Sequence, residues 1–317
     1  MTDEKINQKY QKKIKLFQKY NKYYYNLNEP IVSDNDFDLL KLEIIKLEKK
    51  YKYLNSTNSP SNSVGFKPSK VFRKVKHTVP MLSLSNAFDE NDLINFEKKI
   101  LNFLNLNKNF NIGFSAEPKI DGISASLIYE DGKFITGLSR GDGKEGEDIT
   151  ENLKTIKDIP YFIKSKNFPK KIDIRGEVFI QNSDFEKLKS KFANPRNTAS
   201  GSLRQKDPKE TKKIPLKFIA YTFGYQKGLK ATSQGEYLKN LKEWGFKTNP
   251  FNKSLEKIKN LMTYYHEIEK KRDDIDFDID GIVYKVDNFQ LQKRLGNVAN
   301  APRWAIAHKF SANSGIS

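Results

Sequence analysis

Three lysines lie in segments with the apolar pattern of β-strands, where a charged amine needs either a partner or a task. They are Lys119 after the apolar stretch 112–116, Lys285 within 282–286 and Lys309 within 304–310. Burial of an unpaired ammonium group is unfavourable, whereas a lysine whose pKa is lowered by burial or by nearby cations becomes a nucleophile. Each lysine alone could point to solvent from one face of its strand. Together with several acids they form a set that favours a chemical role, with Lys119 of Lys119-Ile120-Asp121-Gly122 as its first member.

The charge of the chain favours a polyanionic partner. The 317 residues carry 57 Lys and Arg against 39 Asp and Glu, a net charge of +18, and nucleic acid is the first candidate. A general bias toward lysine would also account for the excess.

The chain has no Cys and three scattered His, which excludes disulfides, thiolate zinc sites and cysteine nucleophiles and disfavours a His-based metal site. With no apolar run of about 18 residues and no apolar signal core, we expect a cytoplasmic protein without a membrane segment.

Two motifs that resemble ligand-binding loops have simpler interpretations. Gly141–Gly146 matches G-x-G-x-x-G, but the segment before it is a predicted hairpin and Asp158, the following acid, lies in a loop, so a dinucleotide fold is disfavoured. Asp276–Gly281 resembles the start of a calcium loop, but its aspartates alternate with apolar residues as in a strand. We therefore expect a flexible loop at the first motif and a strand at the second.

The elements that must position these residues follow an α+β order. Apolar residues at helical spacing predict two helices within residues 1–54, with Ser33 as the N-cap of the second, and residues 55–68 have the composition of a linker. Further helices are predicted at 89–104, 183–192, 233–244 and 254–271. Strands are predicted at 123–137 with a turn at Asp131-Gly132, and at 172–180, 216–225 and 275–286. This pattern predicts a small helical domain with its linker (1–68) and a domain of antiparallel sheets with flanking helices (69–317).

These segments resemble, in the same order, the motifs of the covalent nucleotidyltransferases, which include DNA ligases, RNA ligases and mRNA capping enzymes. The matching segments are Lys119–Gly122, Arg175–Glu177, Phe218–Gly224, Asp280–Lys285 and Trp304–Phe310. Longer motifs resemble the bacterial NAD-dependent DNA ligases, namely Met81–Phe88, Ser139–Asp148, Phe192–Gln205 and Ala301–Trp304. Tyr24-Tyr25 and Asp34-x-x-Phe37-Asp38 are similar to the NMN-binding helices of that family. The resemblance covers nearly the whole chain and implies an ATP-grasp-like ligase domain behind an NMN-binding domain.

The resemblance implies a role for each matched residue. Lys119 would attack the α-phosphate of NAD, expelling NMN and forming lysyl-AMP, while Lys285 and Lys309 stabilise charge on the phosphates. Glu117 would bind the adenine amino group and Tyr221 would cover the base. Ser83 and Leu84 would line the nucleotide pocket, and Asp121, Arg140 and Glu177 would contact the ribose or organise the phosphates. The NMN half would be bound by Tyr24, Tyr25, Asp34 and Asp38, although an aspartate at a helix start can equally act as a cap. Arg196, Arg204 and Arg272 are the candidates for contacts with phosphate or nicked DNA.

The resemblance also implies partners and departures. Magnesium or manganese would be held mainly by phosphate oxygens and water, with no zinc and no dedicated protein cage. The chain would act as a monomer on nicked double-stranded DNA in the nucleoid of a bacterium, in replication and repair. Phe37 stands where the family usually has Tyr, so one hydroxyl contact to NMN is lost. The family normally continues into an OB-fold, a zinc finger, a helix-hairpin-helix region and a BRCT domain, so a chain ending at Ser317 is expected to self-adenylate but seal nicks poorly. The alternatives are an ATP- or GTP-using RNA ligase or capping enzyme and an inactive basic DNA-binding module.

Overall fold

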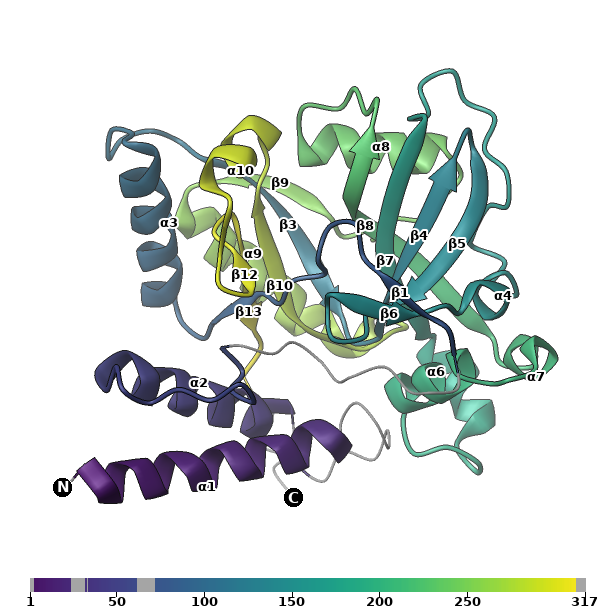
Figure 1. Cartoon of the computed structure of the whole chain (residues 1–317). Coiled ribbons are helices and arrows are strands. Elements are labelled where there is room, and N and C mark those ends of the chain that lie inside the picture. The colour runs from purple at the N-terminus through teal and green to yellow at the C-terminus, as the bar shows by residue number, and fades with distance from the viewer. Residues whose placement is uncertain (1–2, 24–31, 33, 62–71, 312–317) are drawn as a thin grey trace.

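The N-terminal part of the chain is a pair of helices with its own apolar core. The computed structural model describes residues 3–23, 32, 34–61 and 72–311. Helices α1 (Asp3–Lys22) and α2 (Asp34–Lys50) pack against each other through the apolar stripe predicted from their spacing (Figure 1). Phe17 stacks on Phe37 with ring centroids 5.5 Å apart, so Phe37 keeps the core role expected of it.

A five-stranded sheet forms the first half of the larger region. Its strand order is β2 (Ser85–Ala87), β13 (Ala305–Lys309), β10 (Ile279–Val286), β3 (Gly113–Ile120) and β9 (Lys253–Glu256). All neighbours are antiparallel except β13 and β2. The helices α3 (Glu90–Leu104), α9 (Ile258–Lys271) and α10 (Phe289–Leu295) share one apolar cluster with this sheet.

A four-stranded antiparallel sheet forms the second half. Its order is β5 (Lys133–Ser139), β4 (Ile123–Glu130), β7 (Lys171–Ile180) and β8 (Leu216–Lys227). The surrounding helices are α4 (Thr150–Leu153), α5 (Asn182–Phe185), η2 (Glu186–Leu188), α6 (Pro195–Leu203), α7 (Pro208–Lys212) and α8 (Gln234–Glu243). Two short ribbons, β1 (Lys74–Lys76) with β6 (Glu145–Glu147) and β11 (Asn297–Val298) with β12 (Ala301–Pro302), complete the strands of the described region.

The α+β prediction is confirmed, and most of its elements lie where expected. Positive φ angles at Asp131 (47°) and Gly132 (78°) produce the predicted hairpin turn between β4 and β5. Residues 140–144 connect β5 with β6, so the loop expected at Gly141–Gly146 ends at Lys144 and its last two residues belong to β6. Of the strand expected at Asp276–Gly281, only residues 279–281 lie in β10. The Ser33 cap lies outside the described residues.

Some element boundaries differ from the prediction. Residues 253–256 pair with β3 as β9, so the expected helix 254–271 begins at Ile258. Residues 272–274 form η3 (Arg272–Asp274), and the strand predicted from 275 begins at Ile279. The expected helix 183–192 is reduced to α5 and η2. Ile275, Phe277 and Ile279 are all buried. The apolar residues therefore alternate with the aspartates as in a strand, although strand β10 begins only at Ile279.

Consecutive strands β3 and β4 belong to different sheets. The chain leaves the five-stranded sheet after Ile120 and enters the four-stranded sheet at Ile123. Asp121 and Gly122 form the link, held by a hydrogen bond from the Asp121 amide to the Asp278 carbonyl (2.8 Å). A Cβ on Gly122 would lie 2.4 Å from the Val178 carbonyl oxygen, so this close approach requires glycine. The Lys119 motif therefore lies where the two sheets meet.

Candidate active site

A large cleft collects residues from both sheets and from α2. Its volume is about 2040 Å³, and its lining includes Lys119, Lys285, Lys309, Glu177 and Asp38. These residues are far apart in the chain, but the sheet order brings β3, β10 and β13 side by side (Figure 1). All three lysines of these strands therefore line the same cleft.

Asp280 joins two of these lysines. Its Oδ2 atom accepts hydrogen bonds from Lys119 Nζ (2.9 Å) and Lys309 Nζ (2.8 Å). Burial would raise the pKa of Asp280, but the two ammonium groups lower it to about 2. Lys309 also pairs with Asp38 of α2 (3.1 Å). Burial disfavours the charged form of Lys309, yet the two carboxylates raise its pKa above the ordinary value, so Lys309 stays a cation in the cleft.

Lys285 forms a second, more deeply buried ion pair. Its Nζ atom donates to Glu117 Oε2 (2.8 Å) and to the Tyr221 carbonyl (2.9 Å), and the two charged side chains are 7% and 5% exposed. Burial lowers the pKa of Lys285, while Glu117 opposes that shift. Glu117 Oε1 accepts from Ser115 (2.9 Å) and Gln234 (2.8 Å). This network fixes the Glu117 carboxylate at the cleft wall.

The acids near the β3–β4 link have different surroundings. Asp121 forms an ion pair with Arg196. Glu177 accepts from Ser124 (3.0 Å) and from the Tyr221 hydroxyl (3.3 Å). Burial raises the pKa of Glu177 to about 7, although the charges of Lys119 and Arg196 oppose the shift. Burial also raises the pKa of the Tyr221 hydroxyl, so that hydroxyl remains a donor at neutral pH.

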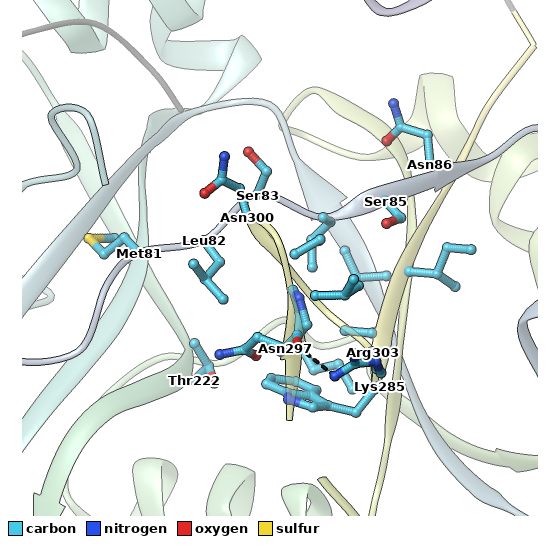
Figure 2. Close-up of a pocket in the computed structure, with 18 of the residues that line it drawn as sticks. Met81, Leu82, Ser83, Ser85, Asn86, Thr222, Lys285, Asn297, Asn300 and Arg303 are labelled. Carbon is cyan, nitrogen blue, oxygen red and sulfur yellow. Dashed lines mark hydrogen bonds between the residues drawn. The ribbon is translucent and has the colours of Figure 1, made fainter. Parts of the chain in front are cut away.

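One wall of the cleft is an extended segment, residues 79–84, that runs between β1 and β2. Figure 2 shows Met81, Leu82 and Ser83 along this segment, with Asn300 beside them. The Ser83 amide donates to the Asn300 carbonyl (2.8 Å). Arg140 donates to the Ser83 hydroxyl (3.0 Å) and to the Met81 carbonyl (3.4 Å). Leu84 also lines the cleft, so the segment presents both residues predicted for the nucleotide pocket.

Comparison with known proteins assigns a family to this arrangement. Residues 69–313 match the family described as NAD-dependent DNA ligase adenylation domain. Residues 3–65 match the DNA ligase-like, N-terminal NAD+-binding domain. The chain belongs to the NAD-dependent DNA ligase family. This finding confirms the resemblance that the sequence motifs indicated.

Two curated relatives of this ligase-family chain have high sequence identity to it. A DNA ligase of Pelagibacter ubique (strain HTCC1062) is 68% identical over all of this chain, which covers 47% of that relative. A DNA ligase of Parvibaculum lavamentivorans is 47% identical over 94% of this chain and 43% of its own length. The chain thus spans less than half the length of either relative. Among solved structures, an archaeal ATP-dependent RNA ligase is 12% identical, with a TM-score of 0.44, covering 86% of this chain and 64% of its own.

Several residues that the sequence predicted for the site lie away from the cleft or outside the described residues. Arg204 pairs with the buried Glu147 (3.1 Å), and Arg272 lies 5.5 Å from the Phe310 ring; neither is among the residues that line the cleft. Tyr24 and Tyr25 lie outside the described residues, as does the side chain of Asp34. Asp38 does line the cleft, where Lys41 and Lys309 lower its pKa against the effect of burial.

Three residues in or behind the cleft have no role in the sequence-based predictions: Gln234 is not named there, and Arg175 and Asp280 appear only as the first residues of matched motifs. Gln234 at the start of α8 donates to both Glu117 (2.8 Å) and the Tyr221 carbonyl (2.7 Å), and no local signal points to it. Arg175 lies two positions before Glu177, so strand periodicity places both on the same face of β7. That spacing is the signal that could have placed Arg175 in the site.

No helix among the described residues is both long and apolar enough to cross a membrane. Within 3–23, 32, 34–61 and 72–311, no cluster of three or more His, Asp and Glu side chains is arranged to hold a metal ion.

Proposed function

We propose that this chain catalyses the first step of NAD-dependent DNA ligation, in which Lys119 becomes covalently bound to AMP. Lys119, an ammonium group paired with Asp280, first releases one proton to solvent. The neutral Nζ atom then attacks the α-phosphorus of NAD, the bond from that phosphorus to the bridging oxygen of NMN breaks, NMN leaves, and the second proton passes from the new phosphoramidate nitrogen to solvent. The observation that carries the proposal is the position of Lys119 and Lys309 on one carboxylate oxygen of Asp280 in a large cleft. A phosphoramidate keeps AMP activated for a second transfer.

The remaining cleft residues support nucleotide binding. A carboxylate offers about four lone-pair sites, and Glu117 uses three of them, which leaves one for the adenine amino group. Tyr221 covers the base, and Ser83 and Leu84 form the pocket wall. Lys285 and Lys309 stabilise charge on the phosphates. Arg140 and Glu177 contact the ribose and the phosphates from the cleft wall, and Asp121 contacts them from the adjoining β3–β4 link, where it pairs with Arg196.

The N-terminal helices would bind the NMN half of NAD. Asp38 reaches Lys309 from α2, which supports an NMN site at the mouth of the cleft. Tyr24, Tyr25 and Asp34 are proposed to complete that site, with Phe37 lacking the family hydroxyl. We propose residues 1–68 and 69–317 as the NMN-binding and adenylation domains.

Magnesium, or manganese in its place, would enter with the phosphates of NAD, because this ion keeps several waters and binds phosphate oxygens. The fit of the site is supported by Asp280 Oδ1, which is buried and has no hydrogen-bond partner among the described residues. Asp280 would therefore be the residue that helps to hold the ion. The bound ion would supply neutralisation of charge on the phosphates.

The later steps of ligation are also proposals for this chain. AMP would pass from Lys119 to the 5′-phosphate of nicked DNA, in replication and repair, and the net charge of +18 supports binding to that polyanion. Arg196, Arg204 and Arg272 are the proposed phosphate or DNA contacts.

The test is intact-mass spectrometry after incubation with NAD and magnesium. We expect one added AMP and released NMN, no adduct in Lys119→Ala, and no adduct when ATP replaces NAD. An adduct in Lys119→Ala would refute the nucleophile. Adduct formation with ATP alone would favour an ATP-using ligase, and folded protein with no adduct would favour an inactive DNA-binding module.

A further inference from the structure

Strand β7 carries a row of charged side chains on one face, of which Arg175 and Glu177 line the cleft. Asp173, Arg175 and Glu177 lie on one face, while Ile172, Ile174 and Val178 on the other face belong to the apolar core. Asp173 and Arg175 are 5% and 7% exposed. Two buried charges on one strand require close partners of opposite charge or good hydrogen-bond acceptors.

Arg175 links the four-stranded sheet to the cleft-wall segment 79–84. Its Nε and Nη2 atoms donate to Asp173 Oδ2 (3.0 and 2.8 Å). Nη1 donates to the Pro80 carbonyl (3.1 Å), and Nη2 also donates to the Val79 carbonyl. Ser126 on β4 donates to the other oxygen of Asp173 (2.5 Å), so the sheet holds Asp173 from a second strand.

These contacts leave Arg175 little capacity to bind a phosphate. A guanidinium has five N–H donors, and four of them are engaged by Asp173, Val79 and Pro80. The planar fork of arginine suits such multiple acceptors, whereas the ammonium of lysine does not. Arg175 is therefore a strut, meaning a side-chain bridge between strand β7 and the extended segment 79–84.

We infer that Arg175 is a positioning residue that holds segment 79–84 so that Ser83 and Leu84 form the NAD pocket. The inference rests on the proposed function of the cleft. Arg175 contacts the start of the segment, at Val79 and Pro80. Arg140 contacts its later part, at Met81 and Ser83. Loosening this wall weakens binding of substrate and transition state alike, so KM for NAD rises while kcat is retained.

The deciding variant is Arg175→Lys, which keeps a cation for Asp173 but loses the fork. In single-turnover lysyl-AMP formation we expect the half-saturating NAD concentration to rise on the order of tenfold, equivalent to about 1.4 kcal/mol, with the maximal rate changed less than about threefold. Hydrogen exchange without NAD should accelerate at residues 77–86 and stay unchanged in β4 and β7. An unchanged half-saturating concentration, or a loss confined to the maximal rate, would overturn the inference.

A second variant and a control separate the strut from general instability. A Cβ on Gly224 would lie 2.0 Å from Asp173 Oδ2 and 2.2 Å from Arg175 Nη2, so Gly224→Ala should displace the pair and reproduce both effects. If Arg175→Lys does not fold, Gly224→Ala decides by the same criteria. Arg294→Lys weakens a guanidinium–carbonyl bond to Leu104 outside the cleft and should change neither readout.

The exchange measurement also separates this inference from the proposed function. If wild-type protein forms no AMP adduct, the proposed function fails. Exchange at 77–86 in the variants still tests the strut, because it requires no NAD. Unchanged exchange there in folded Arg175→Lys would overturn the strut even if adduct formation is normal.

Discussion

Replacing Lys285 by Met should destabilise the protein by about 3 kcal/mol, because it leaves the Glu117 carboxylate buried without its cation. The two side chains are 7% and 5% exposed and 2.8 Å apart, and breaking such a pair costs about 3–5 kcal/mol. Ser115 and Gln234 still donate to Glu117, which favours the lower end of that range. The free energy of unfolding should be measured in urea by circular dichroism. NAD must be absent, because ligand binding would add its own stabilisation.

The double variant Lys285→Met/Glu117→Gln tests the physical reason. Removing the orphaned charge should recover about 2 kcal/mol relative to Lys285→Met, since replacing both members of a buried pair is often nearly neutral. The control is Lys213→Met at the exposed Lys213–Glu210 pair, which should cause no measurable change. The reasoning is refuted if Lys285→Met is as mild as this control, or if the double variant is no more stable than the single one.

Two more predictions concern Glu177 and Gly122. The pKa of Glu177 is about 7 in the folded state against 4.5 ordinarily, so the folded state binds the extra proton and stability falls as pH rises from about 4.5 to 7. The free energy of unfolding should be measured by thermal unfolding at pH 5 and at pH 8. Between these two pH values wild type should lose up to about 3 kcal/mol more than Glu177→Gln does, and equal losses in the two proteins would contradict this. Gly122→Ala, whose Cβ meets the Val178 carbonyl, should cost about 1–3 kcal/mol. Gly201→Ala, on α6 with open space, should gain about 0.5–1 kcal/mol, and a similar loss in both would refute the steric argument.

Local patterns predicted those elements whose signals lie within a few residues. The Asp131-Gly132 turn, helix 89–104 and helix 233–244 needed only turn chemistry or apolar periodicity, and the structure has them at or near the predicted bounds. The predicted start of strand β10, at residue 275, was wrong by four residues, because the strand begins at Ile279. Alternating burial occurs in bends as well as in strands, and pairing with β3 decides which of them forms.

The cleft was predictable as a set of residue types but not as a set of contacts. The motifs around Lys119, Lys285 and Lys309 identified the family, which the comparisons confirmed. Gln234 was not predicted, because its partner Glu117 is 117 positions away in the sequence.

The residue types of the site, the apolar faces of the helices and strands, and the resemblance to NAD-dependent DNA ligases all follow from the amino-acid sequence. The three-dimensional fold places β3 and β4 in different sheets and brings Lys119 and Lys309 to the same oxygen of Asp280. It also brings Arg175 to the segment 79–84. The physical reason is that periodicity reports which side of an element is buried, whereas strand pairing between distant segments decides which side chains meet.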